Sequence, residues 1–584
     1  MDAAEMKGED NSFDRILEII GNDGPYQRRF NLVFGYNSFD RILEIIGNDG
    51  PYQRRFNLVF GYLLLIAVYM PSLNIIMALA APEHWCYIPG REGTNYTLDE
   101  WKEMKIPKEN NTQGVYTYSS CKMYNTSNHR DTILTDCQYG WEYDQTWYTT
   151  TAVTQENWIC NNELHVTNVF VFTKIGDFLG TFIFGQIGDL IGRKPTFYIT
   201  LSVLFVGRVM SIFTSKYIWV FAFAALLGNL ATPSVFQSPL TVAMEISKNE
   251  NRAKVQFAQA MGSTTALCLM PFPKTRIVLK DWVSFMLITS LPCGIYLISC
   301  KWFVESPRWL ASRQETKKCV KELEKIAKVN GSQLNDEVLM ILDRSTQSKE
   351  ATYGFMTLFS NWPLAKKTIL LMIVWISVNL LYFTLVMNVN NLGGNPFLNY
   401  FFQGLAELPA ALLGKYFCDK MGRRWTHRYA FIAAASSSVI MAVTINNNNL
   451  LWLTSTVVVF LKFFSTITWY AINLHTIEMF PTCIRQTGIA FCVITASAVS
   501  TAAPYIVYLG TSVNLKYPYV ILAGIAVIGA ITGLFLSETL NQSLPETIED
   551  VRNKSNRNKT VLNSVSNVNN VEEIKLRNIE NNMA

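Results

Sequence analysis

Two charged residues, Glu407 and Lys462, lie inside long apolar stretches of the sequence. A charged side chain at the centre of a hydrocarbon layer costs roughly 2.5–3.5 kcal/mol, so each needs a partner or a function. A carboxylate among aromatic rings attracts cations, and one ring stabilises an ammonium group by about 0.5–2 kcal/mol. We expect Tyr382 and Trp469 to supply such rings. The pattern indicates a binding site for a cation; the alternative is an internal ion pair between Glu407 and Lys462.

A second pair of charges is predicted from helix geometry. Asp177 precedes Asp189 by 12 residues, and Arg208 follows Arg193 by 15. Counting outward from the turn between two antiparallel helices, at 1.5 Å per residue, places Asp177 and Arg208 at similar depth. The sequence therefore predicts a buried ion pair between Asp177 and Arg208, with Lys174 as the competing partner of the carboxylate.

The elements that carry these residues are apolar runs of about 20 residues, long enough to cross a bilayer. Only 16% of the 584 residues are charged and 49% are apolar, whereas a soluble protein has about 25% charged residues. We predict an all-α membrane protein with twelve transmembrane helices. The expected spans are 56–81, 165–187, 196–213, 217–245, 254–272, 282–304, 366–388, 396–417, 427–445, 449–474, 486–509 and 517–537.

Two long segments between the spans differ in charge. Residues 82–164 hold 12 acidic and 6 basic residues, whereas residues 305–367 hold 11 basic and 8 acidic residues. Basic loops stay on the cytoplasmic side of a membrane. The sequence therefore predicts that 82–164 is extracellular and that both termini are cytoplasmic, in a multi-pass protein of the plasma membrane.

The cysteines agree with this orientation. Cys86, Cys121, Cys137 and Cys160 all fall in the segment 82–164. Four cysteines in an oxidising compartment indicate two disulfides, with three possible connectivities. The same segment carries glycosylation sequons at Asn95, Asn110 and Asn125. We expect a cross-linked and glycosylated extracellular cap.

One repeat in the sequence is identical and one is divergent. Residues 11–36 recur without a change at 37–62, and only the second copy continues into an apolar run. Such identity is better explained by a recent duplication or a sequence-assembly error than by function. In the divergent repeat, GQIGDLIGRK (185–194) is similar to GKYFCDKMGRR (414–424).

The divergent repeat extends to further charged positions. Glu245 precedes Arg252 by seven residues, and Glu478 precedes Arg485 by seven, 233 residues later; Glu305 and Glu538 show the same offset. Repeats of this kind indicate a tandem duplication of a six-helix unit. In each half, we expect a charge cluster at the cytoplasmic mouth that closes in one state and opens in another; the alternative is a static turn that only sets topology. The predicted gating residues are Asp189, Arg193, Glu245, Arg252, Asp419, Arg423, Glu478 and Arg485.

Signatures of enzymes are missing from the sequence. It contains no G-x-x-x-x-G-K-[ST] phosphate-binding motif and no H-E-x-x-H zinc motif. We expect no catalytic activity, no cofactor and no metal site. The partners indicated are a small organic ion and the lipid bilayer, with no nucleic acid and no obligate protein partner.

Several motifs resemble the organic-cation, organic-anion and carnitine transporter family of the major facilitator superfamily. The second-half motifs are AELPA (406–410), LKFF (461–464), IEMFPTCIRQTG (477–488) and SLPETIED (543–550); SFDRILEIIGNDGPYQRR (38–55), CQYGWEYDQTWYTTTAVTQENWIC (137–160) and ESPRWL (305–310) resemble the first half. The resemblance implies a fold of two homologous six-helix bundles with a large extracellular loop between helices 1 and 2. It also implies that Glu407 contributes to cation binding.

The sequence departs from this family in several features, and two of them concern charged positions. Ala224 lies where members have an arginine in the fourth helix. Ser497 occupies the position in the eleventh helix where cation transporters tend to have Asp and anion transporters Arg, so we include Ser497 among the expected substrate contacts.

We expect transport of a small organic cation or zwitterion by alternating access, as a facilitator, exchanger or ion-coupled carrier. The alternatives are a non-transporting membrane sensor and a proton-coupled symporter of the sugar type. The expected domains are an amino-terminal cytoplasmic segment (1–55), a first bundle with the cap (56–304), a cytoplasmic loop (305–365), a second bundle (366–540) and a disordered cytoplasmic tail (541–584).

Overall fold

The computed structural model describes residues 38–540, apart from 48, 94, 111–115, 125–133, 248–250, 270–280, 300–301, 335–337, 339–341, 343–354 and 482–483. The first copy of the identical repeat (11–36) and the predicted disordered tail (541–584) lie outside the described residues. The second copy forms helices α3 (Ser38–Ile46) and α4 (Pro51–Phe56), followed by a π-helical segment, Asn57–Leu63, that leads into α5.

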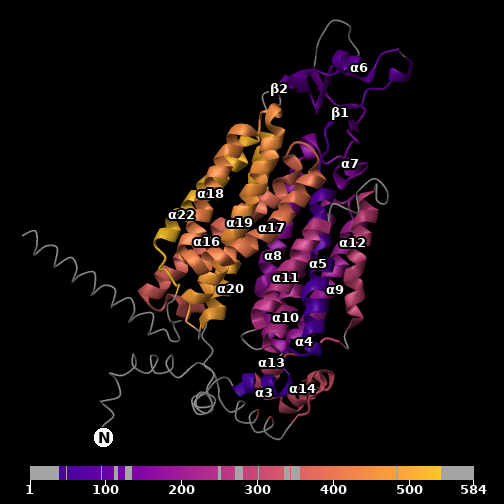
Figure 1. Ribbon diagram of the computed structural model, residues 1–584. Helices are drawn as coiled ribbons and strands as arrows, with labels where there is room; N and C mark the ends of the chain where they lie inside the picture. Colours follow the sequence, from indigo (N-terminus) through magenta and orange to yellow (C-terminus); the bar gives the residue numbers. More distant parts are fainter. Residues whose placement is uncertain are drawn as a thin grey trace, which may run out of the picture.

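The long helices form two bundles, coloured indigo to magenta and orange to yellow in Figure 1. The N-terminal bundle contains α5 (Leu64–Ala78), α8 (Leu164–Ile191), α9 (Arg193–Phe213), α10 (Ile218–Glu245), α11 (Arg252–Leu269) and α12 (Trp282–Leu297). The C-terminal bundle contains α16 (Trp362–Met387), α17 (Pro396–Met421), α18 (Arg423–Thr444), α19 (Leu451–Met479), α20 (Arg485–Val499), α21 (Ala503–Ser512) and α22 (Lys516–Leu534). A 3₁₀ turn, Ser500–Ala502, joins α20 to α21.

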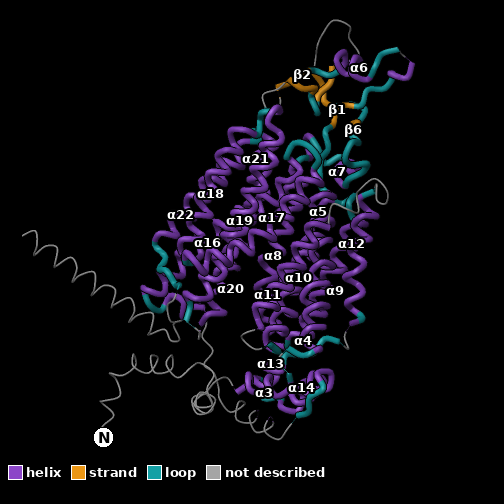
Figure 2. Tube along the Cα trace, viewed as in Figure 1, coloured by secondary structure: helices purple, strands orange, loops and turns teal. Residues whose placement is uncertain are grey.

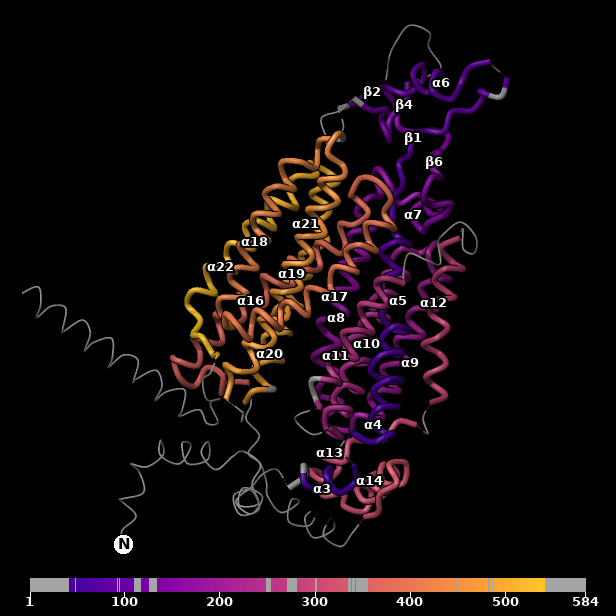
Figure 3. The backbone as a smooth tube through the Cα atoms, in the orientation of Figure 1, coloured from indigo at the N-terminus to yellow at the C-terminus, as the bar shows by residue number. Residues whose placement is uncertain are grey.

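The two bundles meet along two helix pairs: α8 packs on α20 and α21, and α11 packs on α17. On the first pair, Phe170 of α8 packs against a small cluster that includes Leu380 and Ala503. On the second, a Cβ added to Gly404 of α17 would lie 3.0 Å from the Leu267 side chain of α11. Phe170 lies near the start of α8, which follows the cap, and Leu267 lies near the end of α11. The bundles approach each other towards the cap (Figures 1 and 3).

The outer surfaces of the bundles are apolar. Eight helices in the described part of the chain are long and apolar enough to cross a membrane, and α12 is a shorter apolar helix. Phe213, Ile295 and Val443 are 70%, 68% and 74% exposed. Exposed apolar surface of this extent is stable in lipid rather than in water. The chain is therefore a multi-pass membrane protein.

The segment 82–164 forms a cap of short strands and helices at one end of the bundles (Figure 2). Strands β1 (His84–Cys86) and β6 (Trp141–Tyr143) pair antiparallel, as do β2 (Lys108–Asn110) with β3 (Tyr116–Tyr118) and β4 (Lys122–Tyr124) with β5 (Leu134–Asp136). The cap also holds α6 (Leu98–Lys105) and α7 (Ala152–Glu156).

Two disulfides, Cys86–Cys137 and Cys121–Cys160, select one of the three connectivities that the sequence left open. Cys160 lies just before α8, so the second disulfide ties the cap to the bundle. Of the predicted glycosylation sites, Asn95 is exposed, Asn110 ends β2 and Asn125 lies outside the described residues.

At the opposite end, α3 packs against α14 (Thr316–Asn330), close to the short helix α13 (Pro307–Ser312) (Figure 3). Ile42, Leu43 and Ile46 of α3 are fully buried in this contact. The side chain of Asn330, the last residue of α14, joins α14 to the end of α3 and the start of α4 by hydrogen bonds. Its amide donates to the carbonyls of Ile46 at 3.0 Å and Gly47 at 3.1 Å, and its oxygen accepts from the backbone N–H of Tyr52 at 3.0 Å.

We predict that Asn330→Ala loosens α3 from α14. The variant leaves the Ile46 carbonyl and the Tyr52 N–H without a partner, and each lost bond costs about 1 kcal/mol. The Gly47 carbonyl still accepts from Gln53 at 2.8 Å. Amide exchange at Leu43–Ile46 should become roughly 30-fold faster, which corresponds to about 2 kcal/mol of local stability. Lys328→Ala changes an exposed residue of the same helix and serves as the control. Equal exchange rates in the two variants would contradict the role of Asn330.

Candidate functional site

Glu407 of α17 and Lys462 of α19 form a buried ion pair with 2.9 Å between the lysine Nζ and the carboxylate Oε1. Glu407 is 8% and Lys462 is 1% exposed. The hydroxyl of Tyr382 on α16 donates to the same carboxylate oxygen at 2.8 Å. The structure therefore contains the ion pair that the sequence offered as the alternative, with one of the two predicted aromatic residues bonded to it.

Aromatic rings form one wall around this pair. The Lys462 ammonium lies 3.2 Å from the centroid of the Tyr382 ring. The Trp469 ring lies 5.4 Å from Tyr382 and 5.7 Å from Trp375, measured between centroids. Trp375 is held in place because its indole N–H donates to the Thr476 hydroxyl at 2.9 Å. Tyr382 and Trp469, the two rings selected from the sequence, are thus neighbours beside Glu407 and Lys462.

Residues of the N-terminal bundle also lie near this pair. Tyr69 of α5 lies near enough to interact electrostatically with both Glu407 and Asp177, and Cys268 of α11 also lies within range of Glu407. Tyr69 in turn packs against Phe236 of α10, with 5.7 Å between ring centroids. Sequence reasoning missed Tyr69 because a single tyrosine in an apolar helix carries no signal of the partner it faces.

Ser497, the remaining predicted substrate contact, lies half-buried on α20. Within the described part of the chain it makes no hydrogen bond to the Glu407–Lys462 pair.

The predicted ion pair between Asp177 and Arg208 is wrong. Asp177 pairs instead with Lys174, one turn away on α8, at 2.9 Å. Arg208 is fully buried and donates to the side chains of Asn229 at 2.9 Å and Ser72 at 3.2 Å. Equal depth did not suffice because the rise per residue fixes height along a helix but not the direction of the side chain.

Arg193 organises the charges at the end of the N-terminal bundle away from the cap. Its guanidinium lies 3.1 Å from Asp189 and 3.8 Å from Glu245. The backbone N–H groups of Arg193 and Lys194 donate to Glu305 at 2.9 and 3.1 Å. Four of the elements of this bundle therefore meet at one charged point: the ends of α8 and α10, the start of α9 and the segment after α12.

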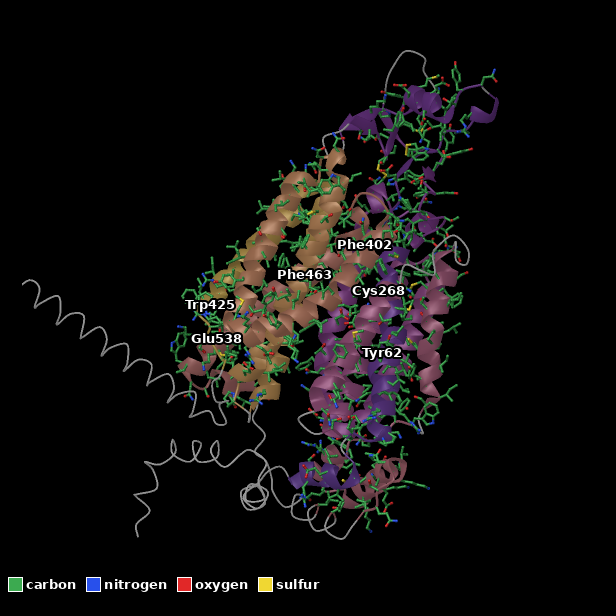
Figure 4. The ribbon with its side chains drawn as sticks, in the orientation of Figure 1. Tyr62, Cys268, Phe402, Trp425, Phe463 and Glu538 are labelled. Atoms are coloured by element: carbon green, nitrogen blue, oxygen red, sulfur yellow. A yellow bond between two sulfur atoms is a disulfide. The ribbon has the colours of Figure 1, made fainter. Side chains whose placement is uncertain are left out.

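The C-terminal bundle repeats this arrangement. Arg423 lies 3.0 Å from Glu478 and 3.9 Å from Asp419. The N–H groups of Arg423 and Arg424 donate to Glu538 at 2.9 and 3.2 Å. Figure 4 labels Glu538 at this end of the bundle, near Trp425.

The two glutamates act as caps of helix N-termini. The turns before α9 and α18 hold Gly192 and Gly422 at φ of 104° and 94°, and a Cβ at either position would lie 2.5 Å from the glutamate Oε2. Glycine therefore lets Glu305 and Glu538 reach the positive ends of the helices. Burial raises the pKa of the Glu305 carboxyl, and the N–H donors of the turn oppose that shift. Sequence analysis found both glutamates as repeat markers but not their capping role.

The predicted gating cluster is thus assembled in part. The ion pairs of Arg193 and of Arg423 each join helices of a single bundle. Arg485 lies at the start of α20, and its Nε and Nη2 are buried without a hydrogen-bond partner among the described residues. The side chain of Arg252 lies outside the described residues.

We predict that Glu538→Gln destabilises the C-terminal bundle. The amide keeps one acceptor but loses the charge that faces the helix N-terminus, at a cost of about 1–3 kcal/mol. The unfolding temperature of the detergent-solubilised protein should fall, and Glu305→Gln should lower it in the same way. Glu324→Gln, an exposed position on α14, is the control. A Glu305→Gln or Glu538→Gln variant that unfolds at the same temperature as Glu324→Gln would contradict the role of these glutamates at the helix N-termini.

Comparison with known proteins shows relatives over most of the chain. The carcinine transporter of Drosophila melanogaster is 28% identical over 82% of this chain and 73% of its own length. Organic cation transporter 1 of Caenorhabditis elegans is 29% identical over 93% of this chain and 88% of its own. The human organic cation/carnitine transporter 2 is 26% identical over 92% and 94%.

The fold is similar to that of a solved transporter. The partially occluded inward-open structure of the xylose transporter XylE from E. coli has a TM-score of 0.56, with 14% identity over 84% of this chain and all of that one. The family model for the sugar (and other) transporters matches residues 108–550. The chain therefore belongs to the sugar (and other) transporter family of the major facilitator superfamily.

Proposed function

We propose that this protein moves small organic cations or zwitterions across the membrane by alternating access. The observation that carries the proposal is the buried contact of Glu407 with Lys462 and Tyr382, which lies where the two bundles face each other. The names of its relatives include transporters of organic cations, of carnitine and of β-alanine.

The chemistry of this site suits an ammonium group. Removing one partner of a buried ion pair costs about 3–5 kcal/mol because it leaves an uncompensated charge. A substrate that brings its own positive charge keeps the Glu407 carboxylate compensated when Lys462 moves away, so the cost of an uncompensated charge falls on the displaced lysine alone. The rings of Tyr382 and Trp469 then contact the ammonium group, and each adds about 0.5–2 kcal/mol.

We further propose twelve membrane spans, with α11, α12, α17 and α18 crossing in addition to the eight apolar helices. The acidic, disulfide-linked segment 82–164 is then extracellular, both termini are cytoplasmic, and the protein resides in the plasma membrane.

With this orientation, the conformation is inward-facing, because the two bundles are joined on the extracellular side. The Tyr148 hydroxyl of the cap donates to Asn390 beyond α16 at 3.3 Å, and the Asn390 amide donates to the Ile76 carbonyl of α5 at 2.8 Å. The Tyr148 ring also packs on Phe397 of α17, at 5.4 Å between centroids. These contacts join the bundles on the extracellular side and must break when the site opens outward.

The proposal predicts that Glu407→Gln lowers the uptake of labelled tetraethylammonium and carnitine by at least about tenfold, because the quaternary ammonium group loses the opposing carboxylate charge and an uncompensated buried charge costs about 3–5 kcal/mol. Uptake by cells should be normalised to surface protein. Glu103→Gln, an exposed position of the cap, is the matched control and should transport like the unmodified chain. Labelled p-aminohippurate serves as the anionic probe.

Three outcomes would contradict the proposal. Uptake that survives Glu407→Gln would exclude Glu407 from the site. Surface protein that binds probes but moves none would support the non-transporting sensor. Uptake of a sugar that depends on a pH gradient would support a proton-coupled symporter.

A further inference from the structure

A second ion pair, Lys174–Asp177 of α8, faces the C-terminal bundle. The Lys174 ammonium lies 3.4 Å from the centroid of the Phe383 ring on α16. Phe383 directly follows Tyr382, and the centroids of these two rings are 5.5 Å apart. The Lys462 ammonium lies over the Tyr382 ring. The two lysines of opposite bundles therefore lie at neighbouring rings of one helix.

Tyr69 of α5 lies within electrostatic range of both Glu407 and Asp177. The side chain of Asp177 is 23% exposed and that of Glu407 is 10% exposed, whereas both lysines are below 10%. Each acid is thus more exposed than its lysine.

The two sides differ in charge. Glu407 and Lys462 compensate each other, but the α8 side holds Lys174 and Arg208 against the single carboxylate of Asp177. Arg208 is fully buried, and its Nε and Nη1 have no hydrogen-bond partner among the described residues. A positive surplus away from water is stabilised by an added anionic group.

We propose that Lys174 and Asp177, with Arg208 behind them, form a second half-site that binds the carboxylate of a substrate whose ammonium lies at Glu407. The inference rests on the proposed transport function and narrows it to zwitterions that carry both groups. Lys174 is the residue that exchanges partners: it leaves Asp177 for the substrate carboxylate, and Arg208 then compensates the charge of Asp177. A bare cation finds no partner for the positive surplus.

The test compares carnitine with carnitine methyl ester, which has the same ammonium group but no carboxylate charge. Uptake of both labelled probes is measured for the unmodified chain, Lys174→Gln, Lys174→Arg and Glu407→Gln, at equal surface protein. Lys174→Gln should raise the KM for carnitine by roughly tenfold or more and change that for the ester by less than about twofold. Lys174→Arg keeps the charge and should retain carnitine uptake. Glu407→Gln should impair both probes.

The outcomes separate the inference from the proposed function. If the unmodified chain prefers the ester, or if Lys174→Gln impairs both probes equally while Lys174→Arg restores both, the half-site is wrong and transport stands. If neither probe enters cells that carry the unmodified chain on their surface, both the proposed transport function and this inference are contradicted. Should Lys174→Gln fail to reach the surface, Asp177→Asn is measured instead. That variant frees Lys174 and should lower the KM for carnitine relative to the ester; an unchanged ratio overturns the inference.

Discussion

The burial of Glu407 with Lys462 is the constraint around which the facing surfaces of the two bundles are arranged. Neither charge can lose its partner in a low-dielectric environment without a cost of about 3–5 kcal/mol. The pair draws on three helices, because α17 carries the acid, α19 the base and α16 the Tyr382 hydroxyl that bonds to the acid. In the proposed mechanism, a ligand opens this arrangement only if it brings charge of its own.

Each bundle is held as a unit by charges at the end away from the cap. Arg193 and Arg423 occupy corresponding positions, and Glu305 and Glu538 cap the helices that begin there. Because these bonds close within a bundle, a bundle can move as one body while contacts between bundles change. The cap end, where Asn390 bridges Tyr148 and Ile76, is where the bundles are joined by hydrogen bonds.

Local sequence patterns predicted much of this arrangement, and side-chain direction accounts for what they missed. The repeated Gly-Arg turns predicted two antiparallel helix pairs, and the structure contains them at Gly192 and Gly422. The Asp177–Arg208 pair failed because depth along two helices does not determine which faces meet. Tyr69 was missed because Glu407 and Asp177, which lie within its electrostatic range, are far away in the sequence, and Glu407 belongs to the other bundle.

A structure with bound carnitine, determined by cryo-electron microscopy in lipid nanodiscs, tests the central claim most directly. The account predicts that the trimethylammonium group lies against the Glu407 carboxylate and the rings of Tyr382 and Trp469. It also predicts that the Lys462 ammonium has moved out of hydrogen-bond distance of Glu407. Carnitine bound elsewhere, with the Glu407–Lys462 contact still near 2.9 Å, would contradict it.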